Sequence, residues 1–297
     1  KDAVSLVFLM PGDTKPRQKR HFHVLLGDAS RRSATQPADA LVTVTENVAR
    51  QGEQYTRIDT PKAQYFFHME GAGFGGLIDT GGKDWISYRT KGGPKGHYRG
   101  IPNLVHPEGH FHPGSDTCTS RMTATGPIVA VIEAESKDGQ WAVRWDVFPH
   151  YARMTLQRAG HAYWFLYEGT PGGRLDEQSD WMVLSSGQRY DASQRWDRPI
   201  ESPEWIYFVD GRSRRLLYLV HHEADNEVDS YWPMQQAMTV FGFGRRDLNK
   251  FMTAVPTHFT IGLADDPSPN EAKAVIHGAY EPLDVTIGSA QPPSRQP

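Results

Sequence analysis

The stretch Trp141-Ala142-Val143-Arg144-Trp145-Asp146-Val147-Phe148 shows most clearly which kind of fold this chain adopts. Tryptophan and valine occupy positions 141, 143, 145 and 147, whereas Arg144 and Asp146 lie between them. A repeat of two residues is the period of a β-strand with one buried face. The stretch therefore predicts a strand whose tryptophans pack into a core.

Runs of the same kind, rich in β-branched and aromatic residues, recur along the chain and are separated by turn signals such as Gly81-Gly82 and Asp210-Gly211. This pattern predicts an all-β fold, a large antiparallel β-sandwich with few short helices. The expected strands are residues 4–10, 21–26, 41–45, 64–69, 84–88, 128–134, 141–148, 152–157, 162–168, 181–184, 204–209, 215–220, 238–243, 258–263 and 283–287. Short helices are expected at 246–253 and from 267 to 273, the latter capped by Ser268 or Asn270.

The composition agrees with this fold and excludes several classes of protein. The 297 residues include 28 glycines and 21 prolines, which favour turns over long helices. No apolar run is long enough for a membrane span, a net charge of −3 argues against nucleic-acid binding, and one cysteine excludes an internal disulfide. We expect a single sandwich domain over residues 1–290, followed by a frayed tail at 291–297.

Residues 97–114, His-Tyr-Arg-Gly-Ile-Pro-Asn-Leu-Val-His-Pro-Glu-Gly-His-Phe-His-Pro-Gly, contain four of the 13 histidines and are predicted to form a rigid irregular loop. Three interpretations remain open. His106, His110 and His112 have a spacing that suits a divalent ion such as Zn²⁺ or Mn²⁺. Alternatively, the loop acts on a substrate without any cofactor, or its histidines are purely structural.

In the metal-free interpretation, His106 or His110 supplies a group that titrates near neutral pH. Arg99 and Asn103 neutralise a carboxylate or hold hydroxyl groups. The flanking His97 and Arg121 are expected to contact the substrate.

Two further segments carry candidate residues. Alternation in residues 163–168 places Trp164, Leu166 and Glu168 on one strand face, where Glu168 is either a general base or a solvated strand end. Next to each other, His221 and His222 must point in opposite directions. Trp164, Tyr231 and Trp232 are candidates for stacking on a sugar ring, although core packing is the commoner role of such rings.

The segment Tyr98-Arg99-Gly100-Ile101-Pro102-Asn103-Leu104-Val105-His106-Pro107 resembles the R-G-G-I-P stretch of the galactose-mutarotase-like superfamily, and residues 259–263 resemble its closing strands. The second glycine of that stretch is absent here. The resemblance implies a supersandwich fold with a concave sheet face that binds a saccharide. It leaves the reaction open, and Glu168, His221 and His222 are the candidates for its catalytic Glu and His.

We expect an enzyme that acts on carbohydrate, with lyase-type β-elimination as the first hypothesis. His106 or His110 would be the base, Arg99, Asn103 and Arg121 would stabilise the enolate, and Tyr151 or His222 would be the acid. The alternatives are a mutarotase or epimerase that uses Glu168 and a histidine, and a non-catalytic carbohydrate-binding module. The near absence of cysteine and the carbohydrate chemistry favour a secreted or periplasmic protein, with no nucleic-acid partner.

Overall fold

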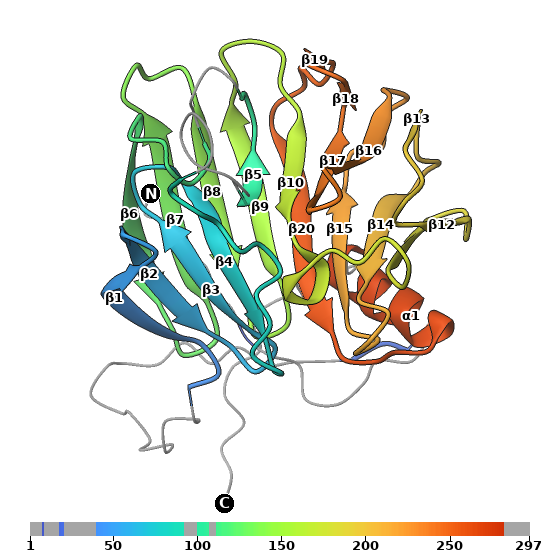
Figure 1. Ribbon diagram of the computed structural model, residues 1–297. Coiled ribbons are helices and arrows are strands. Elements are labelled where there is room, and N and C mark those ends of the chain that lie inside the picture. Colours follow the sequence, from blue (N-terminus) through green and yellow to red (C-terminus); the bar gives the residue numbers. More distant parts are fainter. Residues whose placement is uncertain (1–7, 9–17, 21–39, 92–99, 107–110, 282–297) are drawn as a thin grey trace, which may run out of the picture.

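A computed structural model describes residues 8, 18–20, 40–91, 100–106 and 111–281, which form two large antiparallel sheets packed face to face (Figure 1). The first sheet has nine strands in the order β1 (Thr43–Arg50), β2 (Glu53–Asp59), β3 (Ala63–His68), β4 (Gly73–Asp79), β5 (Gly100–Asn103), β10 (Phe165–Gly169), β17 (Met238–Phe243), β16 (Asp229–Met234) and β13 (Trp196–Arg198). The all-β sandwich predicted from the sequence is confirmed.

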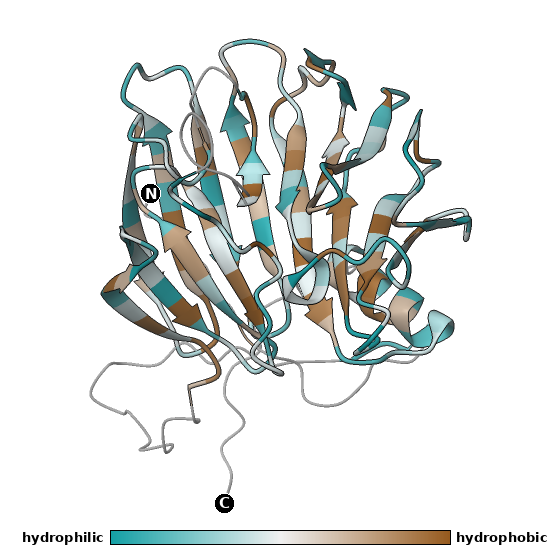
Figure 2. Cartoon of the chain, in the orientation of Figure 1, coloured by the Kyte–Doolittle hydropathy of each residue, from teal (hydrophilic) through white to brown (hydrophobic). Residues whose placement is uncertain are grey.

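The second sheet also has nine strands, and the chain crosses between the two sheets several times. Its order is β12 (Arg189–Asp191), β11 (Trp181–Leu184), β14 (Glu204–Val209), β15 (Leu216–His221), β20 (Thr257–Ala264), β9 (Ala152–Arg158), β8 (Ala142–Val147), β7 (Ala130–Ser136) and β6 (Cys118–Thr125). A small two-stranded antiparallel ribbon follows β17. It consists of β18 (Arg245–Arg246) and β19 (Asn249–Lys250), each two residues long. Apolar colour is concentrated on the strands and polar colour on the connections (Figure 2).

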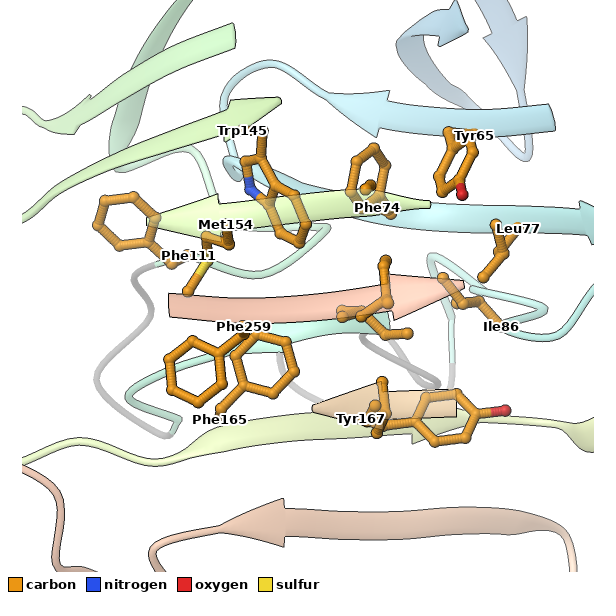
Figure 3. Packing of buried hydrophobic residues seen from close by; sticks show 14 of the residues in the cluster. Tyr65, Phe74, Leu77, Ile86, Phe111, Trp145, Met154, Phe165, Tyr167 and Phe259 are labelled. Atoms are coloured by element: carbon orange, nitrogen blue, oxygen red, sulfur yellow. The ribbon is translucent and has the colours of Figure 1, made fainter. Parts of the chain in front are cut away.

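The core between the sheets is built largely from aromatic rings (Figure 3). Trp145 meets Phe74 of the opposite sheet edge-to-face with ring centroids 4.6 Å apart, and Phe165 stacks on Phe259 at 4.2 Å. Arg144 points away from this core and binds Asp146. The face predicted for the opening stretch is therefore confirmed.

One long helix, α1 (Pro269–Tyr280), covers the outer face of the second sheet. Ser268 caps it, and its apolar side, represented by Ile276, packs with Tyr218 and Val220 of β15. The predicted helix start is confirmed. Among the described residues, no helix has the length and apolar character that a membrane span requires.

The predicted helix at 246–253 is wrong, because the chain turns at Asp247 (φ 53°) and forms the β18–β19 ribbon. Leu248 is 70% exposed, so this segment has no continuous apolar face for a helix to bury. Residues 84–88 form only one β-bridge and not the predicted strand. The Asp84 carboxylate accepts hydrogen bonds from the backbone N–H groups of Leu77 and Ile86, which are then not free to pair with another strand.

A strand also appears where a loop was predicted. Gly100–Asn103 forms β5 between β4 and β10, with Ile101 opposite Phe74 and Asn103 opposite Leu166. The partners of β5 are distant in the sequence, so the residues of β5 alone carry no pattern that predicts this strand. The predicted strands at 21–26 and 283–287, and all but residue 8 of the one at 4–10, lie outside the described residues.

Candidate functional site

Glu168 lies on the outer face of the first sheet, the face that points away from the second sheet. Its neighbours Phe165 and Tyr167 point inward against Phe259 and Phe208, so alternation turns Leu166 and Glu168 outward. The predicted face of Glu168 is confirmed. The side chain does not face open water, however, because the residue is only 4% exposed.

Three buried hydrogen-bond donors surround Leu166 on this outer face. They are Asn103 Nδ2, Trp164 Nε1 and Arg245 Nε, and none has a hydrogen-bond partner among the residues that the structure describes. Asn103 sits directly opposite Leu166, and the Arg245 guanidinium lies 5.6 Å from the Trp164 ring centroid. A buried donor without an acceptor costs about 1–3 kcal/mol, so such groups call for an explanation. We call these three residues and Glu168 the outer-face cluster.

Arg245 is held over the sheet by the shape of its surroundings. A Cβ at Gly242 would come within 2.6 Å of Leu166 and 2.9 Å of Arg245, so glycine leaves the room that both side chains use. Arg245 donates from a guanidinium NH₂ group to Ser230 Oγ at 2.8 Å. Burial lowers the pKa of Arg245, and the charge of Glu168 opposes that shift.

Two basic residues of this region were not predicted from the sequence: Arg245, and Lys250, whose Nζ lies 4.6 Å from the Trp164 ring centroid. Both belong to the β18–β19 ribbon that was predicted to be a helix. The charged, turn-forming sequence Arg245-Arg246-Asp247-Leu248-Asn249-Lys250 was the signal that could have revealed a ribbon instead.

A cavity of about 340 Å³ opens at the end of β10, two residues beyond Glu168. This volume is in the range of small-molecule sites. Its lining is polar and basic and comes from three connections: Ser87, Arg89, Thr170, Gly173, Arg174, Leu175, Gln236 and Ala237. Arginine side chains at such a place suit oxygen-rich or anionic groups.

The histidine loop is described only in part. His106 is half-buried and its backbone N–H donates to Asn103 Oδ1 at 3.0 Å, which brings it beside the outer-face cluster. His112 is buried, its Nδ1 is 2.8 Å from the carbonyl oxygen of Pro113, and its ring centroid is 6.1 Å from that of His106. The remaining predicted site residues of this region, His97, Arg99 and His110, lie outside the described residues.

Tyr151 and His222 lie on the opposite side of the molecule, against helix α1. His222 Nε2 is 2.8 Å from Thr260 Oγ1, and its ring lies 5.9 Å from that of Tyr280. Burial and the nearby Arg153 lower the pKa of His222 to about 4. Both sheets separate these residues from Glu168, so the structure does not bring them into one site.

The other predicted substrate contacts are also scattered. Arg121 lies on edge strand β6 and pairs with Glu133 at 2.6 Å. Tyr231 is fully buried in the core, where its hydroxyl donates to the Ala192 carbonyl. Trp232 is 38% exposed on the outer face of β16, opposite Val240. Of the predicted stacking residues, Trp164 and Trp232 share the outer face with Glu168.

Comparison with solved structures finds the same fold of two large antiparallel sheets, the fold that the resemblance to the galactose-mutarotase-like superfamily implied. The crystal structure of HI1317 is 12% identical with a TM-score of 0.51, and the match covers 75% of this chain and 99% of that one. YeaD from Salmonella typhimurium, described as "a putative mutarotase", is 14% identical with a TM-score of 0.50, over 75% of this chain and 97% of that one. No protein-family model and no curated protein sequence matches the chain.

Proposed function

We propose that this protein interconverts the anomers of an aldose, or epimerises a related sugar, on the outer face of the first sheet. The observation that carries the proposal is the outer-face cluster, in which Glu168 stands among three buried donors that lack acceptors. Sugar hydroxyl groups supply the missing acceptors. The fold shared with YeaD supports this reaction over β-elimination, for which no comparison provides support.

In this reaction, the Glu168 carboxylate takes the proton from the anomeric hydroxyl group. As the C1–O5 bond breaks, a general acid protonates the ring oxygen and C1 becomes a carbonyl carbon. Rotation about C1–C2 and ring closure by the reverse transfers yield the other anomer. Arg245 places a positive charge close to Glu168, and the Glu168 charge in turn opposes the lowering of the Arg245 pKa by burial.

His106 is the proposed acid. Its position beside Asn103 places it at the same edge of the cluster, and imidazole exchanges protons near neutral pH. Asn103 would then have two roles, since its Oδ1 fixes the His106 backbone and its Nδ2 donates to the sugar.

The test is the rate of mutarotation, followed by polarimetry or by NMR exchange, on a panel of free aldoses and hexose phosphates. The protein should accelerate the interconversion of at least one of them, and Glu168→Gln should remove the acceleration. A matched control is Glu135→Gln, which changes an exposed carboxylate on the far sheet. Binding without acceleration would instead identify a carbohydrate-binding module, and an unsaturated product from uronate glycans would restore the lyase hypothesis.

A further inference from the structure

A second group of chemically active side chains lies between the sheets at the rim of the sandwich, whereas the outer-face cluster lies on the other face of the first sheet. Glu204 begins β14 and His221 ends β15, and the two residues are directly opposite in the antiparallel register. His221 Nδ1 is 2.5 Å from Glu204 Oε2, and both residues are buried. Asp225, in the loop that follows, adds a carboxylate, and the three ligand atoms lie within 4.8 Å of one another.

The hydrogen bonds on the other side of the imidazole fix its tautomer. The Glu223 carboxylate accepts the backbone N–H of His258 at 2.7 Å and the Thr257 hydroxyl proton at 2.9 Å. Because Thr257 gives its only proton to Glu223, its oxygen must accept from His221 Nε2, which is 3.1 Å away. In the neutral ring, the proton is therefore on Nε2, and Nδ1 presents a lone pair to Glu204.

A nitrogen lone pair and a carboxylate oxygen at 2.5 Å repel each other unless a positive centre lies between them. That centre is either a proton or a metal ion. Asp229 lies beside this group and accepts hydrogen bonds from the backbone N–H groups of Ile200 and Gly244, and burial raises the pKa of its carboxyl group well above the usual value. Among the described residues, no lysine or arginine forms an ion pair with Glu204, Asp225 or Asp229.

From this geometry we infer that Glu204, His221 and Asp225 bind a divalent transition-metal ion of the Zn²⁺ type, which replaces the proton shared by Glu204 and His221. One imidazole and two carboxylates are a ligand set that Zn²⁺ accepts. A metal-bound histidine ordinarily uses its other ring nitrogen to donate to an oxygen, as His221 does towards Thr257.

The local structure permits both entry and coordination. Asp225 is only partly buried and lies between the exposed residues Ala224 and Asn226, so an ion can reach the site from solvent. Ligand atoms around Zn²⁺ lie on the order of 3.3 Å apart, so Glu204 and His221 need to separate by less than about 1 Å. The bound ion would join β14, β15 and the 222–228 loop.

Isothermal titration of the metal-stripped full chain with ZnCl₂ tests the inference. The wild type should bind about one equivalent and release about one proton, measured from the heat in buffers of different ionisation enthalpy. Asp225→Asn, a change on a partly exposed loop, should weaken binding at least about tenfold. Glu227→Gln on the same loop is the matched control and should bind like the wild type.

Circular dichroism establishes that each variant is folded. Two results would overturn the inference: absence of Zn²⁺ binding by the wild type, or equal affinity in the wild type and Asp225→Asn. A third variant, His106→Gln, identifies the competing location. If that variant loses the ion while Asp225→Asn retains it, the metal belongs to the histidine loop and not to this rim.

Discussion

Glu168 and Glu204 are both strand carboxylates and both are almost completely buried, at 4% and 1% exposure, yet their surroundings are opposite. Around Glu168 the unsatisfied groups are donors, on Asn103, Trp164 and Arg245. Around Glu204 the neighbouring groups are the His221 imidazole, at 2.5 Å, and the Asp225 carboxylate. The first environment suits an oxygen-rich ligand, and the second suits a cation.

The comparison shows that neither residue type nor burial decides what a buried carboxylate does. What differs is the sign of the neighbouring charge and the direction of the neighbouring protons. Asp180 provides a third case, because it is 2% exposed and accepts mainly backbone N–H groups, from Asp176 and Gly211. Each case leads to a different measurement.

The largest effect is expected when the two proposed sites are perturbed in turn. Glu168→Gln should lower kcat for anomer interconversion by about 10²–10⁴-fold, because it removes the general base. It should leave Zn²⁺ affinity unchanged. Asp225→Asn should show the reverse pattern. Loss of both properties in either variant would mean that the two regions are coupled and that the comparison fails.

The second prediction concerns the residue that orients His221. Thr257→Val keeps the shape of the side chain but removes the acceptor for Nε2–H, and it should weaken Zn²⁺ binding by about 10–100-fold. Measured by titration, the loss should come with unchanged mutarotation kinetics. Thr155→Val on neighbouring β9 serves as the control for a threonine-to-valine change in this sheet. If Thr257→Val binds Zn²⁺ as tightly as the wild type, Thr257 does not position His221 for the metal ion.

The third prediction uses Asp180, a buried carboxylate that belongs to neither proposed site. Burial raises the pKa of Asp180 from 3.8 to about 6. The folded state therefore binds more protons than the unfolded state between these values, and the stabilisation present below about pH 4 is lost as the pH rises through 6. The loss amounts to about 3 kcal/mol.

Urea unfolding of the wild type and Asp180→Asn at several pH values measures this effect. The variant should lose the Asp180 contribution to the slope of stability against pH between about 4 and 6, whatever its offset at one pH. Glu168→Gln should keep that contribution. Identical slopes in the wild type and Asp180→Asn would contradict the assignment.

The sequence predicted features that depend on local alternation. It placed Trp145 in the core and Glu168 on the opposite face from Tyr167, and it required His221 and His222 to diverge. The opposition of Glu204 and His221 was also within reach, since both lie equally far from the centre of the turn at residues 210–215. Hairpin register is a local property, so this pair needed no distant contact to be found.

The remaining parts of the sites depend on contacts between distant segments. Asn103 reaches the cluster only because β5 pairs with β10, more than 60 positions later in the chain. Arg245 reaches it because a ribbon, and not a helix, follows β17. Similarly, Thr257 meets His221 through the β15–β20 pairing. Alternation says which face a side chain is on, but it does not say which strand lies next to it.

The smallest expected effects separate two tryptophans on the same outer face. Trp164→Phe keeps the buried ring but removes the Nε1 donor, so KM should rise about fivefold, the equivalent of about 1 kcal/mol for one hydrogen bond. Trp232 is exposed and its ring faces the Arg195 guanidinium at 5.8 Å, so Trp232→Ala should change KM by less than about twofold. Both values come from initial-rate kinetics on the best aldose of the panel. If Trp232→Ala has the larger effect, the sugar stacks at the exposed side of β16, and the unsatisfied donors around Leu166 do not define where it binds.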